Sequence, residues 1–204
     1  GLGSSSAVVI GVLNALHNFK GESVTARQLA EEACKIEIDI LKKPIGYQDQ
    51  YAIAFGGANF ILFSKNISVT PDFSTDYNNL MLFYTGISRK TNDILSKLKL
   101  DKKILDKNKA LVFSSTPLGE VLNINWEFKK KLNPLVTNKT IDNLYNKAIQ
   151  AGAIGGKIIG AGGGGFFLFV VPEDKKSAVR EALGLRELPF NLSRYGSRVI
   201  FNTL

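Results

Sequence analysis

The chain has 204 residues, of which 45% are hydrophobic, so it is long enough to bury the core of one large or two small domains. Its 26 Lys and Arg residues against 18 Asp and Glu give a formal net charge of +8, which favours anionic ligands such as nucleotides and sugar phosphates but also fits a solvated, lysine-rich surface. No apolar run reaches the roughly 18 residues of a membrane span, and the single cysteine excludes an internal disulfide framework, so we expect a cytoplasmic protein that does not act in a membrane.

The first part of the chain is expected to contain two helices and a pair of strands. The nearly uncharged stretch 6–20 predicts a buried helix, and apolar spacing predicts a second helix over 25–42. The segment "YAIAFGGANFILFS" (51–64) alternates like two strands around a Gly-Gly turn. Turn-forming residues over 67–79 then predict a domain boundary near residue 75.

Beyond that boundary, strands and helices are mixed. The run "LMLFYTG" (80–86) predicts a strand, and a helix is expected to follow Ser88. Further helices are predicted over 104–114, 117–132, 139–151 and 173–184, and further strands over 157–160, 166–171 and 197–202. Mixed elements in two parts predict an α+β fold.

The opening segment "GLGSSSA" (1–7) leads directly into the first predicted helix. Its glycines allow a ligand to approach the backbone, and the following helix adds unpaired N–H groups and the positive end of its dipole. Its serine hydroxyls can bind Mg²⁺ or donate to phosphate oxygens. The segment matches neither G-x4-G-K-[ST] nor G-x-G-x-x-G, and by itself it is more typical of a structural helix start than of a phosphate site.

Two carboxylates stand out in the next segments. Glu37 falls on the apolar arc of its predicted helix, near Ala33 and Cys34, where a carboxylate is costly unless a cation or several donors meet it. A structural salt bridge and a metal ligand both remain open for it. Asp49 lies in the polar run Gln-Asp-Gln between ordered elements, which by itself is typical of a surface turn.

A block of four glycines, Gly162–Gly165, follows the strand predicted at 157–160. Consecutive glycines cost conformational entropy on folding, so we expect that the backbone comes close to something at this point. The close approach could be to a phosphate or to another segment of the chain.

Together, "GLGSSSA", "IGYQDQ" (45–50) and "KIIGAGGGGFF" (157–167) resemble, in order and character, motifs of the GHMP small-molecule kinases. The segment "GYQDQYAIAFGGANFI" (46–61) is similar to the heptose 7-phosphate kinases within that family, and the resemblance extends over nearly all of the chain. It implies a partial, ribosomal-protein-S5-like nucleotide-binding domain over 1–75 and a ferredoxin-like domain over 76–204. Because family members carry a further segment before the first motif, the resemblance also implies that this chain is a fragment.

The resemblance implies roles for particular residues. Asp49 would be the base that takes the proton from the sugar hydroxyl, and Glu37 would hold Mg²⁺ together with Ser5, with Ser4 or Ser6 as alternatives to that serine. Apart from the resemblance, Arg89, which follows "YTGIS", and Lys157 are candidates for contacting an anionic sugar, since a guanidinium can bind phosphate through two donors. The ATP phosphates would lie against Gly1, Gly3, Ser4, Ser5, Ser6, Gly162 and Gly163.

The function implied by the resemblance is an ATP- and Mg²⁺-dependent kinase. It would phosphorylate the anomeric hydroxyl of D-glycero-D-manno-heptose 7-phosphate and so give the 1,7-bisphosphate. A kinase for galactose, fucose or an N-acetylhexosamine, and a non-catalytic nucleotide or sugar sensor, remain alternatives. Nucleic-acid binding is not expected, because aromatic residues do not interleave with the basic residues of the lysine-rich runs.

Overall fold

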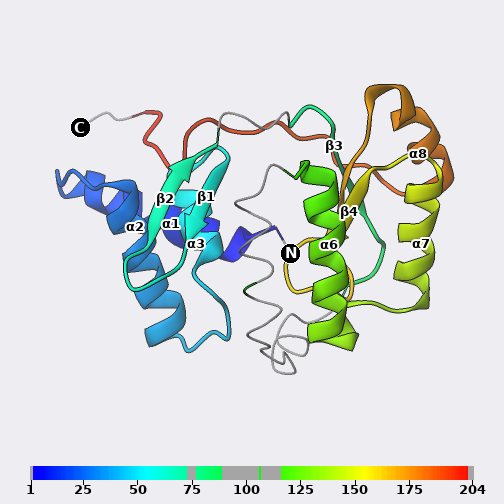
Figure 1. The fold of residues 1–204 in the computed structure, drawn as a ribbon. Helices are drawn as coiled ribbons and strands as arrows, with labels where there is room; N and C mark the ends of the chain where they lie inside the picture. Colours follow the sequence, from blue (N-terminus) through cyan, green and yellow to red (C-terminus); the bar gives the residue numbers. More distant parts are fainter. Residues whose placement is uncertain (1, 73–76, 89–105, 107–115, 202–204) are drawn as a thin grey trace. The chain divides into compact units, whose positions relative to one another are not determined.

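Residues 2–72, 77–88, 106 and 116–201 are described by the structure, a computed structural model (Figure 1). The chain divides into two units. One comprises residues 2–75 together with 191–204, and the other comprises residues 76–190. The chain thus changes unit after residue 75, and the last 14 residues belong to the same unit as residues 2–75. The two units are called the N-terminal unit and the C-terminal unit below.

Helices dominate the N-terminal unit. Its elements are α1 (Ser4–Phe19), α2 (Ala26–Cys34), the π-helical turn η1 (Lys35–Ile40), α3 (Gln48–Phe55), β1 (Asn59–Leu62) and β2 (Ser68–Pro71). Thr25 begins α2 with a capping box, since its hydroxyl accepts from the Gln28 N–H and its own N–H donates to Gln28 Oε1. The core of the unit consists of Ile10, Leu29, Ala30, Ala33, Cys34, Tyr51 and Ala54.

Three predictions for this unit are wrong. The first predicted strand of 51–64 is instead part of α3, which ends at Phe55 and is capped by Gly56 with a φ of +65°; only the second part forms strand β1. Short apolar runs fit either element, and here Tyr51 and Ala54, three residues apart, share the buried face of a helix. The first helix is not buried all round, because four of its apolar side chains are exposed: Val8, Val12, Leu16 and Phe19.

The third wrong prediction is the closing strand at 197–202, since residues 197–201 form no strand. This part of the chain runs closely over the end of α3. A Cβ placed on Gly196 would lie 1.9 Å from the carbonyl oxygen of Ala54, and the Gly57 N–H donates to the Ser193 carbonyl at 2.7 Å. The segment is therefore held by close backbone packing and single hydrogen bonds rather than by a sheet.

The C-terminal unit combines a three-stranded sheet with helices. Its elements are β3 (Leu80–Tyr84), α6 (Leu118–Leu132), η2 (Pro134–Val136), α7 (Lys139–Gln150), β4 (Gly155–Ile158), β5 (Phe166–Val170), η3 (Glu173–Lys175) and α8 (Lys176–Leu183). The strands are antiparallel in the order β3-β5-β4, and α6 packs against β4 (Figure 1). The fully buried Trp126 on α6 lies against Phe167. The predicted α+β class is confirmed.

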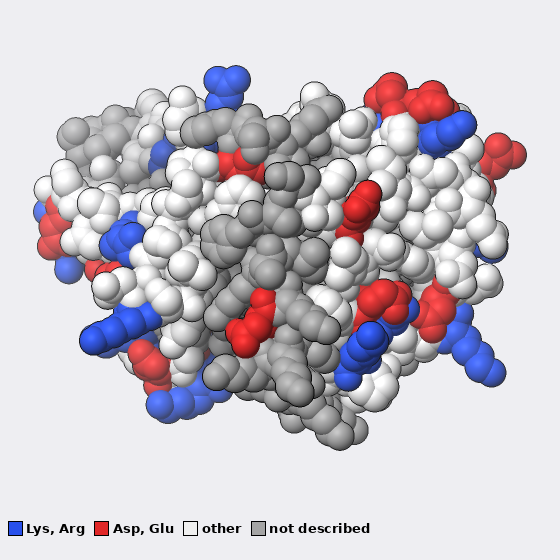
Figure 2. Space-filling model, in the orientation of Figure 1, with Lys and Arg blue, Asp and Glu red and all other residues white. Residues whose placement is uncertain are grey.

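Charged side chains are interspersed on the face drawn in Figure 2, where blue Lys and Arg lie among red Asp and Glu. Such a mixed surface is typical of a solvated, lysine-rich protein. None of the helices that the structure describes is long and apolar enough to cross a membrane. Apart from residue 106, the helix predicted over 104–114 and the one expected after Ser88 lie outside the described residues.

Candidate active site

The first turn of α1 offers backbone donors to an anion. Gly3 precedes the helix with a φ of +69°, a left-handed conformation that glycine adopts without strain, and it supplies no side-chain cap. The first backbone bond of the helix runs from the Ala7 N–H to the Gly3 carbonyl at 3.0 Å. The N–H groups of Ser4, Ser5 and Ser6 therefore have no partner within the helix, which is the usual arrangement of a phosphate-binding helix start.

Glu37 is the centre of a polar cluster beside this turn. Its side chain is fully buried, and both carboxylate oxygens accept hydrogen bonds. Ser5 Oγ donates to Oε1 at 2.9 Å, and Ser6 Oγ donates to Oε2 at 2.6 Å. Gln50 Nε2, from α3, donates to Oε2 at 2.7 Å.

A cation completes the set. Lys43 Nζ lies 2.9 Å from Glu37 Oε1 and donates to Ser5 Oγ at 2.6 Å. Burial by itself would raise the pKa of Glu37, but the hydrogen bonds from Ser6, Lys43, Ser5 and Gln50 outweigh it and lower that pKa. Glu37 is therefore a carboxylate at neutral pH, and the cation or donors that a buried charge needs are present.

The backbone around Glu37 explains how Lys43 reaches it. Glu37 lies on η1, a π-helical segment whose backbone hydrogen bonds span five residues instead of four, a feature often found at functional sites. The chain then reverses at Lys42, whose φ of +53° is the only positive value for a non-glycine residue in the described part of the chain. After the reversal, the Lys43 N–H donates to the Glu37 carbonyl at 2.9 Å.

Asp49 is exposed, as its polar neighbours suggest, but it lies in the first turn of α3 rather than in an irregular turn. A Cβ placed on Gly3 would lie 3.5 Å from Asp49 Cγ, so this carboxyl group is next to the start of α1. Partial loss of water and then the negative charge of Glu37 raise the pKa of Asp49. Within the described residues, Asp49 forms no ion pair, which leaves it available as a proton acceptor.

The donor set of this cluster suits magnesium. The described residues contain no group of three or more His, Cys, Asp or Glu side chains that could enclose a metal by themselves. Magnesium commonly needs only one or two carboxylates, because substrate phosphates and water complete its coordination. The ammonium group of Lys43 marks a position between Ser5 Oγ and Glu37 Oε1 that accepts positive charge. Ser5 and Glu37 thus fit Mg²⁺, and Ser6, which is buried, fits a supporting role.

The glycine block in the C-terminal unit lies close to other segments of the same unit. A Cβ on Gly162 would lie 2.7 Å from Val136 Cβ, and one on Gly164 would lie 2.5 Å from the Ile87 carbonyl oxygen. The Gly163 N–H donates to the Val136 carbonyl at 2.7 Å, so it is already used within the protein. Of the two explanations left open by the sequence, a close approach to other chain segments is present.

Lys157 also belongs to the C-terminal unit, on β4. Its ammonium group donates to Asn125 Oδ1 of α6, and burial lowers its pKa. Nearby, Lys129 Nζ donates to the carbonyls of Ile158 at 3.2 Å and Gly160 at 2.5 Å. Burial, followed by the charge of Lys157, lowers the pKa of Lys129 to about 7. Two neighbouring lysines thus surround the residues that lead into the glycine block.

The structure brings together only part of the predicted site. Gly3, the serines of α1, Glu37 and Asp49 form one cluster in the N-terminal unit. Gly162, Gly163 and Lys157 lie in the C-terminal unit. Gly1 and Arg89 lie outside the described residues.

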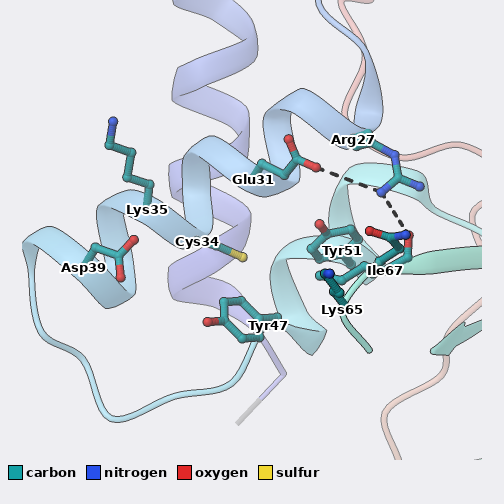
Figure 3. A pocket seen from close by; sticks show the side chains of 10 residues that line it. Arg27, Glu31, Cys34, Lys35, Asp39, Tyr47, Tyr51, Lys65 and Ile67 are labelled. Atoms are coloured by element: carbon teal, nitrogen blue, oxygen red, sulfur yellow. Dashed lines mark hydrogen bonds and ion pairs between the residues drawn. The ribbon is translucent and has the colours of Figure 1, made fainter. Parts of the chain in front are cut away.

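A separate cavity of about 700 Å³ lies in the N-terminal unit (Figure 3). It is lined by side chains of α2, η1, α3 and the adjoining loops, among them Arg27, Lys35 and Tyr47. Arg27 Nη1 is engaged with the Ile67 carbonyl at 3.0 Å. Cys34 also lines the cavity, but burial and then the charges of nearby carboxylates raise the pKa of its thiol to about 11, so it is protonated at neutral pH.

Sequence reasoning missed Lys43 and Gln50. Gln50 belongs to a polar run that resembles a surface turn, and only its position in the first turn of a helix places it in the interior. Lys43 is one of many lysines in a basic chain, and the left-handed backbone at Lys42 that returns it to Glu37 has no glycine to signal it. An unpaired Glu37 on an apolar helix face was the one signal that a nearby cation was needed.

Comparison with known proteins gives consistent results. The chain is 34% identical, over 206 residues, to the D-glycero-alpha-D-manno-heptose 7-phosphate kinase of Campylobacter jejuni; the match covers 90% of this chain and 61% of that protein. It is 27% identical to the mevalonate kinase of Thermococcus sibiricus, covering 98% of this chain and 65% of the relative. The chain therefore spans less than two thirds of the length of these relatives.

A solved structure shows the same fold. The D-glycero-D-manno-heptose 1-phosphate kinase from Bacteroides thetaiotaomicron superposes with a TM-score of 0.66 at 27% identity, covering 96% of this chain and 62% of that one. Family models match both parts of the sequence: the N-terminal domain of GHMP kinases matches residues 1–57, and the C-terminal domain of GHMP kinases matches residues 110–188. With both domain models matched in order and the serine-carboxylate cluster lying within the first, the chain belongs to the GHMP kinase family.

Proposed function

We propose that this protein is an ATP- and Mg²⁺-dependent kinase that transfers a phosphoryl group to the anomeric hydroxyl of D-glycero-D-manno-heptose 7-phosphate. The observation that carries the proposal is the cluster at the start of α1. There, N–H groups that have no partner within the helix, a hydroxyl-carboxylate pair and a separate carboxylate lie within one unit. These groups supply an anion site, a cation site and a proton acceptor.

Each group has a distinct part in phosphoryl transfer. The first-turn N–H groups of α1 bind and orient phosphate oxygens, which is most of what this reaction asks of a protein. Ser5 and Glu37 would hold Mg²⁺, which, when bound, offsets the negative charge of the phosphates. Asp49, beside Gly3, would accept the proton of the attacking hydroxyl, and its raised pKa makes it a better base than an ordinary aspartate.

The choice of sugar rests on similarity. The Campylobacter jejuni relative acts on a heptose 7-phosphate by its name, and the Bacteroides structure is also named for a heptose phosphate. These names support a heptose phosphate as the substrate class for this chain. Lys157 and Arg89 are proposed to contact the sugar phosphate, and Gly162 and Gly163 are proposed to line the nucleotide site. Two domains, with their boundary near residue 75, are proposed to share these roles in the cytoplasm.

Turnover by the full-length protein tests the proposal. ³¹P NMR would follow ATP, Mg²⁺ and heptose 7-phosphate, with the Asp49→Asn variant as control. A new anomeric phosphate signal with the unmodified protein alone is the expected result. Turnover of galactose, fucose or an N-acetylhexosamine, and not of the heptose phosphate, would assign that sugar as the substrate instead. Nucleotide binding with no turnover of any sugar in the panel would favour the sensor.

A further inference from the structure

The ammonium group of Lys43 lies on the two atoms that fit Mg²⁺. It is 2.6 Å from Ser5 Oγ and 2.9 Å from Glu37 Oε1, and these two oxygens are themselves 2.9 Å apart. The three groups form a closed triangle in which one positive charge is shared between a hydroxyl and a carboxylate. The cation position of the cluster is therefore filled by a side chain of the protein itself.

The two partners of this ion pair differ in how freely they can move. The Glu37 side chain has no exposed surface and is held by Ser6 and Gln50 as well, whereas 36% of the Lys43 side chain is exposed. The backbone of Lys43 is fixed by its N–H bond to the Glu37 carbonyl. Its flexible four-carbon side chain can thus turn into solvent without moving the backbone or the carboxylate.

We propose that Lys43 is the resident counter-ion of Glu37 and competes with the divalent cation for Ser5 and Glu37. The inference rests on the proposed function only in that it takes these two residues as metal ligands. Magnesium binds oxygen at about 2.0–2.1 Å, so an ammonium group and a metal ion cannot both occupy the space between the same two oxygens. Entry of the metal then requires that Lys43 leaves.

This competition gives Lys43 a definite role. Without metal, Lys43 neutralises a buried carboxylate that would otherwise be uncompensated, and so it keeps the site folded. With metal, the same charge is replaced by a stronger one, and the ammonium group of Lys43 gives up its contacts with Ser5 and Glu37 and turns into solvent. The intrinsic affinity of the site is accordingly reduced, and metal is retained best when phosphate oxygens supply further ligands. Lys43 is therefore a positioning residue that links metal binding to the anionic substrate.

Mn²⁺ binding, followed by the electron paramagnetic resonance signal of the free ion, tests the competition without any turnover. Lys43→Met removes the charge and keeps an unbranched side chain of similar length. Lys20→Met is the matched control, because it makes the same change of net charge at the exposed far end of α1, about 24 Å along the helix from Ser4. We expect Lys43→Met to bind Mn²⁺ about tenfold more tightly than the unmodified protein, because the metal no longer has to displace the charge-assisted hydrogen bonds of Lys43. Lys20→Met should bind Mn²⁺ with unchanged affinity.

A second variant separates the inference from the proposed function. Glu37→Gln is expected to abolish Mn²⁺ binding, both alone and when it is combined with Lys43→Met. If Glu37→Gln binds as tightly as the unmodified protein, the ligand assignment on which both proposals rest is wrong. If Glu37→Gln abolishes binding but Lys43→Met binds no more tightly, only the competition is overturned. An equal gain in Lys20→Met would also overturn it, since the effect would then be one of net charge.

The unfolding temperature gives an independent measurement on the same proteins. Without metal, Lys43→Met should unfold at a lower temperature than the unmodified protein, because the buried carboxylate has lost its counter-ion. Added MgCl₂ should raise the unfolding temperature of Lys43→Met more than that of the unmodified protein, with NaCl of equal ionic strength as control. Equal gains in both proteins would contradict the inference.

Discussion

Gln50 Nε2 donates to Glu37 Oε2 at 2.7 Å, and both side chains are fully buried. The other end of the Gln50 amide, its carbonyl oxygen, has no hydrogen-bond partner among the described residues. The amide is therefore held in place chiefly by Glu37, and it connects α3 to η1 next to Asp49. A structural contact and the proposed chemistry thus depend on the same carboxylate.

Glu37 is expected to make stability sensitive to acid. Its pKa in the folded protein lies below the ordinary value of 4.5, so as pH falls the unfolded chain takes up a proton first. The stabilisation is complete above pH 4.5 and is lost as pH falls through the folded pKa. Urea unfolding between pH 7 and pH 3 should show a steeper fall in the free energy of unfolding for the unmodified protein than for Glu37→Gln. Parallel profiles would show that other carboxylates control acid unfolding.

The two serines that contact Glu37 should give opposite phenotypes. Ser6 is buried, so Ser6→Ala leaves a buried carboxylate oxygen short of a donor and should lower the free energy of unfolding by about 1–3 kcal/mol. Ser5 is exposed and lies at the proposed metal position, so Ser5→Ala should change stability less but weaken Mn²⁺ binding. Ser4→Ala, at the exposed serine of the same turn that is the other alternative ligand, should leave Mn²⁺ affinity unchanged if Ser5 binds the metal. A larger loss of metal affinity in Ser6→Ala would transfer the ligand role to Ser6.

Asp49→Asn should lower turnover by about 10²–10⁴-fold, the usual contribution of a positioned base, while ATP affinity stays similar. In the unmodified protein, turnover should fall as pH decreases through the pKa of Asp49, because only the carboxylate accepts a proton. Loss of water and the charge of Glu37 raise that pKa, so the fall should be centred above the ordinary value of 3.8. The pH profile of kcat/KM measures it, and full turnover by Asp49→Asn would remove Asp49 from the mechanism.

The sequence predicts the parts of the fold that have a clear period or a motif. Amphipathic spacing places α6 and α7 correctly, and the glycine and serine motifs indicate the family. It fails over "YAIAF", because a five-residue apolar run fits a strand and a buried helix equally well. It also fails over 197–201, where the short apolar run Val199–Phe201 forms no strand.

The sequence predicts the carboxylates of the candidate site but not Lys43 and Gln50, which contact Glu37. A carboxylate on an apolar helix face is visible in a sequence, because it violates the helical pattern. The partner that compensates it depends on a chain reversal at Lys42 in an unusual backbone conformation. Similarly, Gln50 looks like a surface residue until helix α3 turns it inward. Long-range contacts of this kind arise from tertiary packing rather than from local pattern.

Lys129 should make stability rise with pH in the alkaline range. Its folded pKa is about 7 against an ordinary 10.5, so between these values the unfolded chain binds a proton that the folded protein does not. The free energy of unfolding of the unmodified protein should therefore increase from pH 7 to pH 10, relative to that of Lys129→Met. Lys131→Met, an exposed lysine of the same helix, is the control and should keep the dependence. If Lys129→Met keeps the same pH dependence, Lys129 stays protonated in the folded protein, held by the two carbonyls that accept from it.

Alanine substitutions at Gly162 and Gly165 distinguish the stability cost of backbone strain from that of steric crowding. Both have positive φ, +99° and +85°, so alanine is strained at either position. A Cβ on Gly162 would also lie 2.7 Å from Val136 Cβ, whereas one on Gly165 meets nothing within 4 Å. Gly165→Ala should therefore lower the free energy of unfolding by about 1 kcal/mol. Gly162→Ala should lower it by about a further 1–3 kcal/mol, because its methyl group also overpacks against Val136. Chemical denaturation measures both, and equal losses would show that η2 yields to the added methyl group.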